Sequence, residues 1–429
     1  MRARGSAHLD AVCLPAGGMK RSPLLPIFLI VLVDILGYTI VLPLLAFYAE
    51  HFGASPLVAT LLVSVYAFCS LLSAPLLGNL SDRYGRRPLL IISQAGTFAG
   101  FVVLGFANSL WLVFLGRILD GITAGNLTIA QAYISDCTPP EKRAKSFAVI
   151  GIAFGIGFFI GPAISGELAK YGLHAPFLAA AALSALSMVC TALMLPRVPL
   201  MVATAATGAG TPEKNAAPLP AGRRPNPFDF ALYVNYFRRP QLGRLLAQFF
   251  LFSFAFSSFT SCFGLFAERR FLWQARDVGH LFAFSGFLGI LLQGGLIGRL
   301  VKRFGEPALA AAGFASAAVA YALLGSAHSV WMLFVAATIS TFGNGVLRPV
   351  LTSRITQVVG REEQGTALGI AQSLGSIAMM LAPPIGGTLI GGDHLTAWGG
   401  VAAGIAGCGL LIARLQQVSG RNEKPGQSG

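Results

Sequence analysis

The sequence predicts an all-α integral membrane protein with twelve transmembrane helices in two pseudo-symmetric six-helix bundles. Hydrophobic residues make up 55% of the 429 residues and charged residues only 11%, whereas soluble proteins carry about 25% charged residues. The apolar residues form runs of about 20, the length at which a helix crosses a hydrocarbon core of about 30 Å. Part of the first half also recurs in the second half at a constant distance along the chain.

The apolar runs place six expected spans on either side of a polar stretch. Residues 197–226, rich in Ala, Pro, Gly and Arg, are typical of a flexible linker. Residues 228–237 predict a short helix on the inner membrane surface. The expected spans are 24–48, 57–77, 89–107, 110–134, 146–169 and 176–196, then 243–266, 278–298, 307–326, 330–357, 365–391 and 396–414.

This division gives the expected domain organisation. Met19 is expected as the natural start, because a basic cap followed by a span is complete without the residues before it. The expected parts are a disordered N-terminal extension 1–18, a bundle 19–196, a cytoplasmic linker 197–240, a second bundle 241–415 and a disordered tail 416–429.

An internal repeat relates the two halves. The pattern G-x-L-x-x-R-x-G occupies residues 78–85 and recurs at 298–305, an offset of 220 residues. A Gly-Pro step at 161–162 has a Pro-Pro counterpart at 383–384, at nearly the same offset. Repeats in the same topology predict two similar bundles related by an axis along the membrane normal, with a site between them near the midplane.

The distribution of basic residues predicts the topology. Of the 31 Lys and Arg residues, 25 fall on one side of the expected membrane, four on the other and two inside spans. By the positive-inside rule, the basic loops are cytoplasmic. The protein is expected in the cell (inner) membrane. Because the number of spans is even, both termini are expected in the cytoplasm. The net charge of +14 is therefore attributed to topology, and no nucleic-acid partner is expected.

No motif of an enzyme stands out in the chain. It contains no P-loop pattern for ATP, and no Ser/His/Asp or Cys/His constellation on a plausible active-site loop. The six cysteines are scattered, with no C-x-x-C pair. We therefore expect neither an enzyme nor a cofactor or metal, and look instead to charges inside the spans, where ionisable residues mark transport pathways.

The first such charge is Asp34, about ten residues into the first span and followed by Tyr38. An unpaired carboxylate in lipid costs several kcal/mol, so Asp34 is expected to face a cavity or to be protonated. The alternative is a structural Asp that bonds to a neighbouring helix.

The fourth span carries a stripe of polar and small residues on one helical face, at about 100° per residue. Arg117 and Asp120 lie three residues apart in it, so they could also simply neutralise each other as a structural staple. The stripe comprises Arg117, Asp120, Gly121, Ala124, Thr128 and Gln131.

Spans 7 and 10 carry weaker signals. Span 10 has a polar stripe of Thr341, Asn344, Arg348 and Thr352. Its buried cation suits recognition of an anion or a counter-charge for Asp34, and pairing with carbonyl groups of a neighbouring helix is the alternative. Span 7 mixes Phe residues with Gln and Ser, as would suit an amphiphilic ring-containing ligand, although most of its Phe residues are expected in lipid or core.

The loop between the second and third spans resembles a known family pattern. It matches every fixed position of G-x-L-x-D-R-x-G-R-R, the loop between helices 2 and 3 of the major facilitator superfamily. The resemblance implies a gating role, in which the Asp meets the N-terminal end of helix 11 when the transporter is open outward. A loop that only sets orientation would explain two of the arginines but not the glycines and the Asp. The residues are Gly78, Asp82, Arg83, Gly85, Arg86 and Arg87.

Three spans resemble the twelve-span drug:proton antiporters, which include the tetracycline exporters. Asp34, Gly37 and Pro43 fit the helix-1 pattern, although Ala46 stands where a second proline is usual. Arg117 fits the helix-4 motif of proton-coupled members, whose Arg is assigned to proton transfer.

The fifth span resembles the helix-5 pattern G-x-x-x-G-P-x-x-G-G that marks antiporters rather than symporters. Gly157, Gly161, Pro162 and Gly166 fit, and Ser165 departs from the pattern. Close packing through small residues would explain the glycines alone but not the Gly-Pro step.

These resemblances imply a secondary active transporter, expected to be a proton-coupled efflux antiporter of amphiphilic, drug- or tetracycline-like molecules that works by alternating access. The expected partners are a small-molecule substrate, protons and the lipid bilayer, with the chain as a monomer. One alternative is a proton symporter or facilitator that imports a small nutrient or ion. Another is a transport-silent receptor, which would not need Asp34, Arg117 and Arg348 inside the bilayer.

Overall fold

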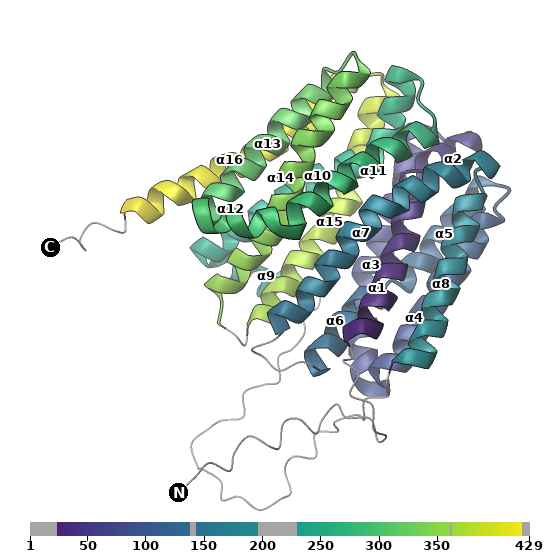
Figure 1. Cartoon of the computed structure of the whole chain (residues 1–429), viewed down its shortest axis with the longest axis horizontal. Helices are drawn as coiled ribbons and strands as arrows, with labels where there is room; N and C mark the ends of the chain where they lie inside the picture. Colours follow the sequence, from purple (N-terminus) through teal and green to yellow (C-terminus); the bar gives the residue numbers. More distant parts are fainter. Residues whose placement is uncertain (1–23, 138–142, 196–229, 361–362, 423–429) are drawn as a thin grey trace, which may run out of the picture.

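The computed structural model describes residues 24–137, 143–195, 230–360 and 363–422, and within them all regular structure is helical (Figure 1). The expected extension 1–18 and linker 197–226 lie outside the described residues. The first half holds α1 Leu24–Val41, α2 Leu45–His51, α3 Pro56–Tyr84, α4 Arg86–Gly105, α5 Leu110–Ile122, α6 Asn126–Cys137, α7 Arg143–Leu168, η2 Ala169–Tyr171 and α8 Ala175–Met194. The second half holds α9 Phe230–Arg238, α10 Pro240–Phe271, α11 Ala275–Leu291, η3 Leu292–Leu296, α12 Ile297–Phe304, α13 Glu306–Gly325, α14 Val330–Val358, α15 Gln364–Gly391 and α16 Leu395–Asn422.

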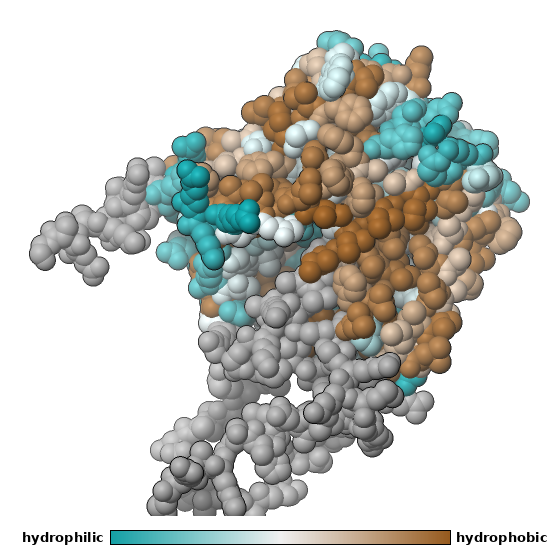
Figure 2. Space-filling model, viewed as in Figure 1, coloured by the Kyte–Doolittle hydropathy of each residue, from teal (hydrophilic) through white to brown (hydrophobic). Residues whose placement is uncertain are grey.

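The helices confirm the expected membrane fold. Eleven spans among the described residues are long and apolar enough to cross a membrane, and the bent pair Leu25–Val41 and Leu45–His51 makes a twelfth. Hydrophobic residues cover much of the face seen in Figure 2, and hydrophilic ones gather toward its edges. In Figure 1 the purple-to-blue helices of the first half lie on one side and the green-to-yellow helices of the second half on the other.

Close packing through glycine recurs at equivalent places in the two bundles. A Cβ built on Gly100 of α4 would lie 2.9 Å from the carbonyl oxygen of Gly116 in α5. A Cβ built on Gly343 of α14 would lie 2.8 Å from the carbonyl oxygen of Gly313 in α13. The third and fourth spans of each half therefore touch backbone to backbone, as glycine interfaces permit in membranes.

The internal repeat also has the same backbone form in both copies. Gly85 joins α3 to α4 with φ +95°, and Gly305 joins α12 to α13 with φ +78°. Positive φ is accessible to glycine at no steric cost, which explains why both copies end their pattern in that residue.

The first span is bent rather than continuous over 24–48 as expected. Helices α1 and α2 meet at 41° across residues 42–44. Pro43 lies at this break, and a proline removes a helical hydrogen-bond donor and clashes with the preceding turn.

The fourth span is interrupted at residues 123–125, between α5 and α6. Ser93 of α4 stabilises the break, because its hydroxyl donates to the Thr123 carbonyl oxygen and accepts from the Gly125 N–H at 3.1 Å. The continuous stripe expected from Arg117 to Gln131 is therefore wrong. The break separates the buried pair Arg117 and Asp120 from Gln131, which is exposed.

The eighth span contains a π-helical turn, η3, between α11 and α12. Single π turns inside helices occur frequently at functional sites. The sequence prediction of a simple span at 278–298 missed this turn. The last helix, α16, also runs to Asn422, well past the expected end at 414 and into the expected tail.

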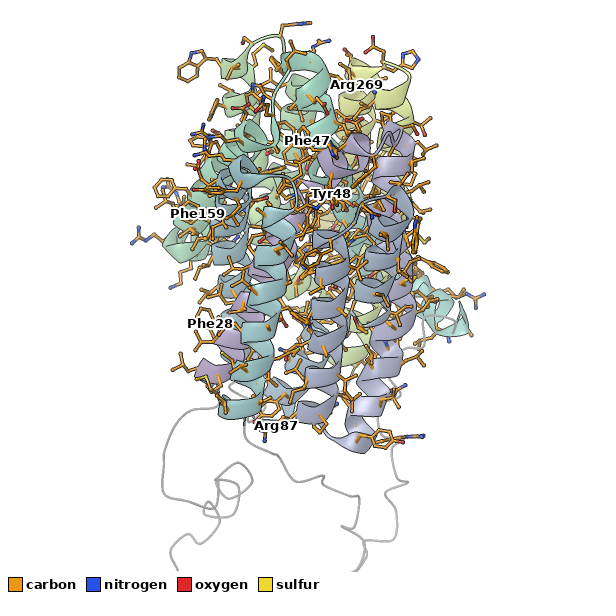
Figure 3. All side chains as sticks on the ribbon, turned by 90° about the vertical axis from the view of Figure 1, so that its right-hand side faces the viewer. Phe28, Phe47, Tyr48, Arg87, Phe159 and Arg269 are labelled. Atoms are coloured by element: carbon orange, nitrogen blue, oxygen red, sulfur yellow. The ribbon has the colours of Figure 1, made fainter. Side chains whose placement is uncertain are left out.

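The two ends of the bundles can be told apart by their arginines. Arg87 and Arg269 lie at opposite ends of the molecule in Figure 3. We call the Arg87 end the inner side and the Arg269 end the outer side, following the basic-residue distribution.

Backbone contacts between the two bundles gather toward the outer side. A Cβ built on Gly279 of α11 would lie 2.6 Å from the carbonyl oxygen of Pro162 in α7. A Cβ built on Gly387 of α15 would lie 2.7 Å from the carbonyl oxygen of Pro56, the first residue of α3. The bundles are thus packed tightly at the outer ends of α7 and α11 and of α3 and α15.

Candidate functional site

Asp34 lies inside the first bundle, where α1 faces α4 and α8. Its side chain is a hydrogen-bonding neighbour of Gln94 and Ser187. Gln94 Nε2 in turn donates to Ser187 Oγ at 2.7 Å. Among the described residues, no donor reaches Asp34 Oδ1 or Gln94 Oε1. The group therefore holds two buried acceptor oxygens that receive no hydrogen bond from the described part of the chain.

Arg117 and Asp120 form a buried ion pair within α5. Arg117 Nη1 lies 2.7 Å from Asp120 Oδ2, and the two residues are 2% and 4% exposed. The guanidinium also covers the ring of Tyr66 at 4.2 Å. The structure thus shows the staple expected from their spacing, while a part for Arg117 in proton transfer stays a prediction.

These groups form one electrostatic cluster at mid-depth in the first bundle. Asp120 lies within electrostatic reach of Asp34. The rings of Tyr38 and Tyr66 lie 6.1 Å apart, and Tyr38 Oη donates to Met379 Sδ of α15 at 4.0 Å. The cluster thus reaches the second bundle through Tyr38.

Arg348 of α14 belongs to the second bundle and lies where the two bundles meet. Its guanidinium covers the ring of Phe154, in α7 of the first bundle, at 4.8 Å. Asn344 behaves differently, because its Oδ1 accepts from Tyr321 Oη of α13 at 3.2 Å. The expected stripe of span 10 therefore splits, with Asn344 bound inside its own bundle and Arg348 pointing to the interface.

The aromatic residues of α10 are mostly core. Phe249, Phe252 and Phe259 are buried in the second bundle, whereas half-buried Phe256 faces Phe158 of α7, with ring centroids 6.2 Å apart. Gln248 is fully buried, and neither polar atom of its amide has a partner among the described residues.

The segment Gly78–Arg87, expected as a loop, is helical: α3 continues to Tyr84 and α4 begins at Arg86, with only Gly85 between them. Local bonds hold this segment at the inner side. Asp82 and Arg86 form an ion pair, and Arg86 Nη1 donates to Ser81 Oγ at 2.7 Å. Arg87 donates to the carbonyl oxygen of Ala192 in α8 (Figure 3). Arg83 is exposed. The segment is therefore fixed to its own bundle here, and its docking on the other bundle stays a prediction.

The N-terminus of α15, where Asp82 is expected to dock, carries an ion pair of its own. Glu363 caps α15, and Arg239 binds it with both terminal guanidinium nitrogens, at 2.6 and 2.9 Å. The adjacent Arg239 guanidinium holds the pKa of the Glu363 carboxyl below its usual range. This pair ties the inner end of α10 to the inner end of α15.

The antiporter-like residues of α7 divide between two neighbours. Gly157 and Gly161 pack against α1, where a Cβ on Gly157 would clash with Ile35 Cγ2 and Thr39 Oγ1 donates to the Gly157 carbonyl oxygen at 2.9 Å. Pro162 and Gly166 contact α11 of the other bundle. Helix α7 is therefore both part of the first bundle and a wall of the interface.

An ionic cluster joins the two bundles at the outer side. Glu167 of α7 pairs with Lys170 in its own bundle. Across the interface its Oε1 lies 3.4 Å from Arg276 Nε and 3.3 Å from His280 Nε2, both on α11. This link closes the same ends that the glycines bring together.

Sequence reasoning missed the partners of the charged residues. Gln94, Ser187 and Tyr66 hold or cover Asp34 and Arg117, and Phe154 covers Arg348. The polar Gln94 in the apolar run 89–107 was the available signal, since an amide in a span needs a hydrogen-bonding partner. Nothing in the local sequence marks Phe154, one of 32 Phe residues.

Comparison with known proteins agrees with this architecture. The family model of the Major Facilitator Superfamily matches residues 27–324 and 273–428. The tetracycline resistance protein of class C from Escherichia coli is 31% identical over 90% of this chain and 93% of its own length. The class D protein from Salmonella ordonez is 30% identical over 90% of this chain and 94% of its own.

Solved structures share the fold. The human organic anion transporter MFSD10 (TETRAN) superposes with a TM-score of 0.69 at 24% identity, covering 91% of this chain and 98% of that one. A mutant of the peptide transporter POT, solved in complex with sulfate, gives a TM-score of 0.74 at 17% identity over 95% of this chain and 96% of its own.

Proposed function

This chain belongs to the Major Facilitator Superfamily, a family of transporters, and we propose that it is a proton-coupled antiporter that exports amphiphilic small molecules by alternating access. The tetracycline resistance relatives at 30–31% identity support an efflux role. The helix-1 and helix-5 patterns support antiport over symport.

The observation that carries the proposal is the acceptor-rich group around Asp34. Asp34 Oδ1 and Gln94 Oε1 are buried acceptors without a donor in the described structure. A buried acceptor left unpaired costs about 1–3 kcal/mol. A proton on the Asp34 carboxyl supplies a donor to a group that has two unpaired acceptors, so the local chemistry favours proton binding at this position.

The surroundings of Asp34 suggest how proton and substrate movement are linked. Asp34 is held by α4 and α8 of its own bundle, and Tyr38, one turn further along α1, contacts α15 of the other bundle. Gain or loss of the Asp34 proton changes the charge of the cluster that faces the interface. Because the backbone contacts between the bundles gather at their outer ends, rocking them apart there would give the cluster access to the outside.

The test is proton-driven transport of tetracycline into everted membrane vesicles. Wild type is expected to accumulate the drug with an imposed proton gradient and to lose this accumulation when an ionophore collapses the gradient. Asp34→Asn, which mimics the protonated carboxyl permanently, is expected to abolish gradient-driven accumulation.

Asp393→Asn is the matched control, because Asp393 is exposed in an outer turn with φ +61°, which Asn also tolerates. Gradient-driven accumulation by Asp34→Asn at the wild-type level would place the proton site elsewhere, with Asp120 as the next candidate. Movement of substrate in the same direction as protons would instead indicate a symporter.

A further inference from the structure

Arg348 is a cation in the middle of a membrane helix, without an acidic partner among the described residues. It lies ten residues before the inner end of α14, or about 15 Å at 1.5 Å per residue. In the described part of the chain no hydrogen bond or ion pair involves its guanidinium, which lies instead over the Phe154 ring. The side chain is nevertheless exposed. Because Phe154 belongs to the other bundle, Arg348 lies where the two bundles meet.

One side chain from the other bundle contacts the guanidinium, and two more lie in its neighbourhood. Phe154 presents its ring from α7. Gln293 reaches across from the π-helical turn η3, where its Oε1 would lie 3.8 Å from a Cβ built on Gly155. Gln293 is exposed, and Gly155 is the chain neighbour of Phe154. Tyr38 of α1 lies within electrostatic reach of Arg348.

The carboxylates of the first bundle do not neutralise Arg348. Asp120 is already paired with Arg117, and Asp34 lies beside Gln94 and Ser187. A counter-charge role for Arg348 toward Asp34, which the sequence left open, stays a prediction.

An unpaired guanidinium at this depth calls for a ligand. The Phe154 ring supplies a cation–π contact, but it leaves the five N–H donors of the guanidinium free. Those donors form a planar fork that matches a carboxylate with two parallel hydrogen bonds. The ring beside the fork gives an apolar surface to whatever carries the anionic group.

We propose that Arg348, Phe154 and Gln293 form a binding subsite for the acidic group and adjoining ring of an aromatic organic acid. Arg348 binds the carboxylate, Phe154 packs on the ring, and the Gln293 amide hydrogen-bonds a polar substituent. This subsite would make aromatic organic acids a substrate class of the proposed exporter. Only the direction of their transport rests on the proposed function. In this proposal the acidic group of the substrate and the transported proton bind at different places, the acidic group at Arg348 and the proton at Asp34.

The test measures binding of two xanthene dyes to the purified full-length protein in detergent by fluorescence anisotropy. Fluorescein carries a free carboxylate and is anionic, whereas rhodamine 6G has the same ring system with an esterified carboxyl group and is cationic. Arg348→Gln is expected to weaken fluorescein binding by about tenfold or more, since a charge-assisted hydrogen bond contributes about 1.5–3 kcal/mol. Rhodamine 6G affinity is expected to stay within about twofold of wild type.

Arg354→Gln is the matched control, because it removes a cation from the same helix that binds Gln416 instead of facing Phe154. It is expected to bind fluorescein like wild type. Arg348→Lys keeps the charge but loses the planar fork and is expected to weaken fluorescein binding by an intermediate factor. Gln293→Leu is expected to weaken it as well, and these two variants carry the test if Arg348→Gln fails to elute as a folded protein.

Three results would overturn the subsite: wild type that does not bind fluorescein, equal losses in Arg348→Gln and Arg354→Gln, or equal losses for both dyes in Arg348→Gln. No proton gradient enters this measurement. Failure of the Asp34→Asn transport test therefore leaves the subsite standing, and failure of the dye test leaves proton exchange standing.

Discussion

At the scale of single residues, the ion pair of Arg117 and Asp120 shows what a charge inside this protein requires. Both side chains are almost fully buried, and Tyr66 covers the guanidinium. Removing one member of a buried pair leaves the other charge without compensation, which costs more than the pair itself contributes.

We therefore expect Asp120→Asn to lower the stability of the protein by about 3–5 kcal/mol. The double variant Arg117→Met with Asp120→Leu is expected to recover most of that loss, because neither charge remains. Thermal unfolding in detergent, followed by tryptophan fluorescence, measures both effects. An Asp120→Asn protein that unfolds at the wild-type temperature would show that Arg117 does not depend on this partner.

The same residues show how far sequence reasoning reaches at this scale. Asp34, Arg117 and Arg348 stand out because charged residues are rare in spans. The neighbours of these charged residues cannot be predicted in the same way. Asp34 and Ser187, for example, lie on different helices of the bundle, and the sequence around either residue does not indicate that they are close. Asn344 was placed with Arg348 by helical spacing, but Tyr321 holds it inside its own bundle.

At the scale of elements, the segment Gly78–Arg87 and its copy at 298–306 have similar backbones and different charges. Both turn at a glycine with positive φ. The first carries the Asp82–Arg86 pair, whereas Lys302 and Glu306 occupy the matching positions of the second. Glu306 Oε1 accepts from Ser353 Oγ at 2.7 Å and from Gln357 Nε2 at 3.2 Å, so the copy is anchored to α14.

This difference predicts unequal effects of mutation. Asp82→Asn is expected to impair transport while leaving the protein folded, because the family pattern assigns this Asp to docking on the N-terminus of α15. A carboxylate at a helix N-terminus is stabilised by about 0.3–1 kcal/mol. Lys302→Ala is expected to impair transport less. The comparison uses initial transport rates normalised to membrane protein, and an equal or larger loss for Lys302→Ala would contradict it.

The outer ionic cluster predicts a measurable change in access. Glu167→Gln removes the links from α7 to Arg276 and His280 of α11. Exposed ion pairs are weak because water screens them, so the outward-open population is expected to rise only by roughly 1.5- to 5-fold. An impermeant thiol reagent added from outside would measure this rise as faster labelling of a cysteine introduced at Phe47, whose ring contacts Gly264 of α10 in the other bundle.

Lys170→Gln is the control, since Lys170 contacts Glu167 from the same bundle and its removal leaves the link between bundles intact. Faster labelling in Lys170→Gln than in Glu167→Gln would show that the cluster does not hold the bundles together.

Element breaks mark the limit of pattern reading. The spans were placed well because long apolar runs have few alternatives to a membrane helix. Pro43 is a sequence indication of the bend between α1 and α2. Used only as part of the helix-1 pattern, it does not predict the bend. The interruption at 123–125 and the π turn at 292–296 leave hydropathy unchanged. Such breaks depend on partners like Ser93, which satisfies the freed backbone groups from another helix.

At the scale of the whole molecule, the two bundles and the basic asymmetry predict the orientation. Reporter domains fused within 197–226 and after the C-terminus are expected to be active in the cytoplasm, and a reporter in the outer turn 106–109 outside it. The reason is the placement of 25 of 31 basic residues on one side. A linker reporter that is active outside would contradict the six-plus-six arrangement.

The division of charge between the bundles has an evolutionary consequence. The described carboxylates at mid-depth, Asp34 and Asp120, belong to the first bundle, whereas Arg348 belongs to the second. On the proposed function, the two similar bundles have different tasks, proton binding in the first and substrate recognition in the second. Substitutions in α11 and α14 could then change the substrate specificity while the proton-binding residues of α1, α4 and α5 stay the same. Related transporters could therefore acquire new substrates without changing how transport is driven.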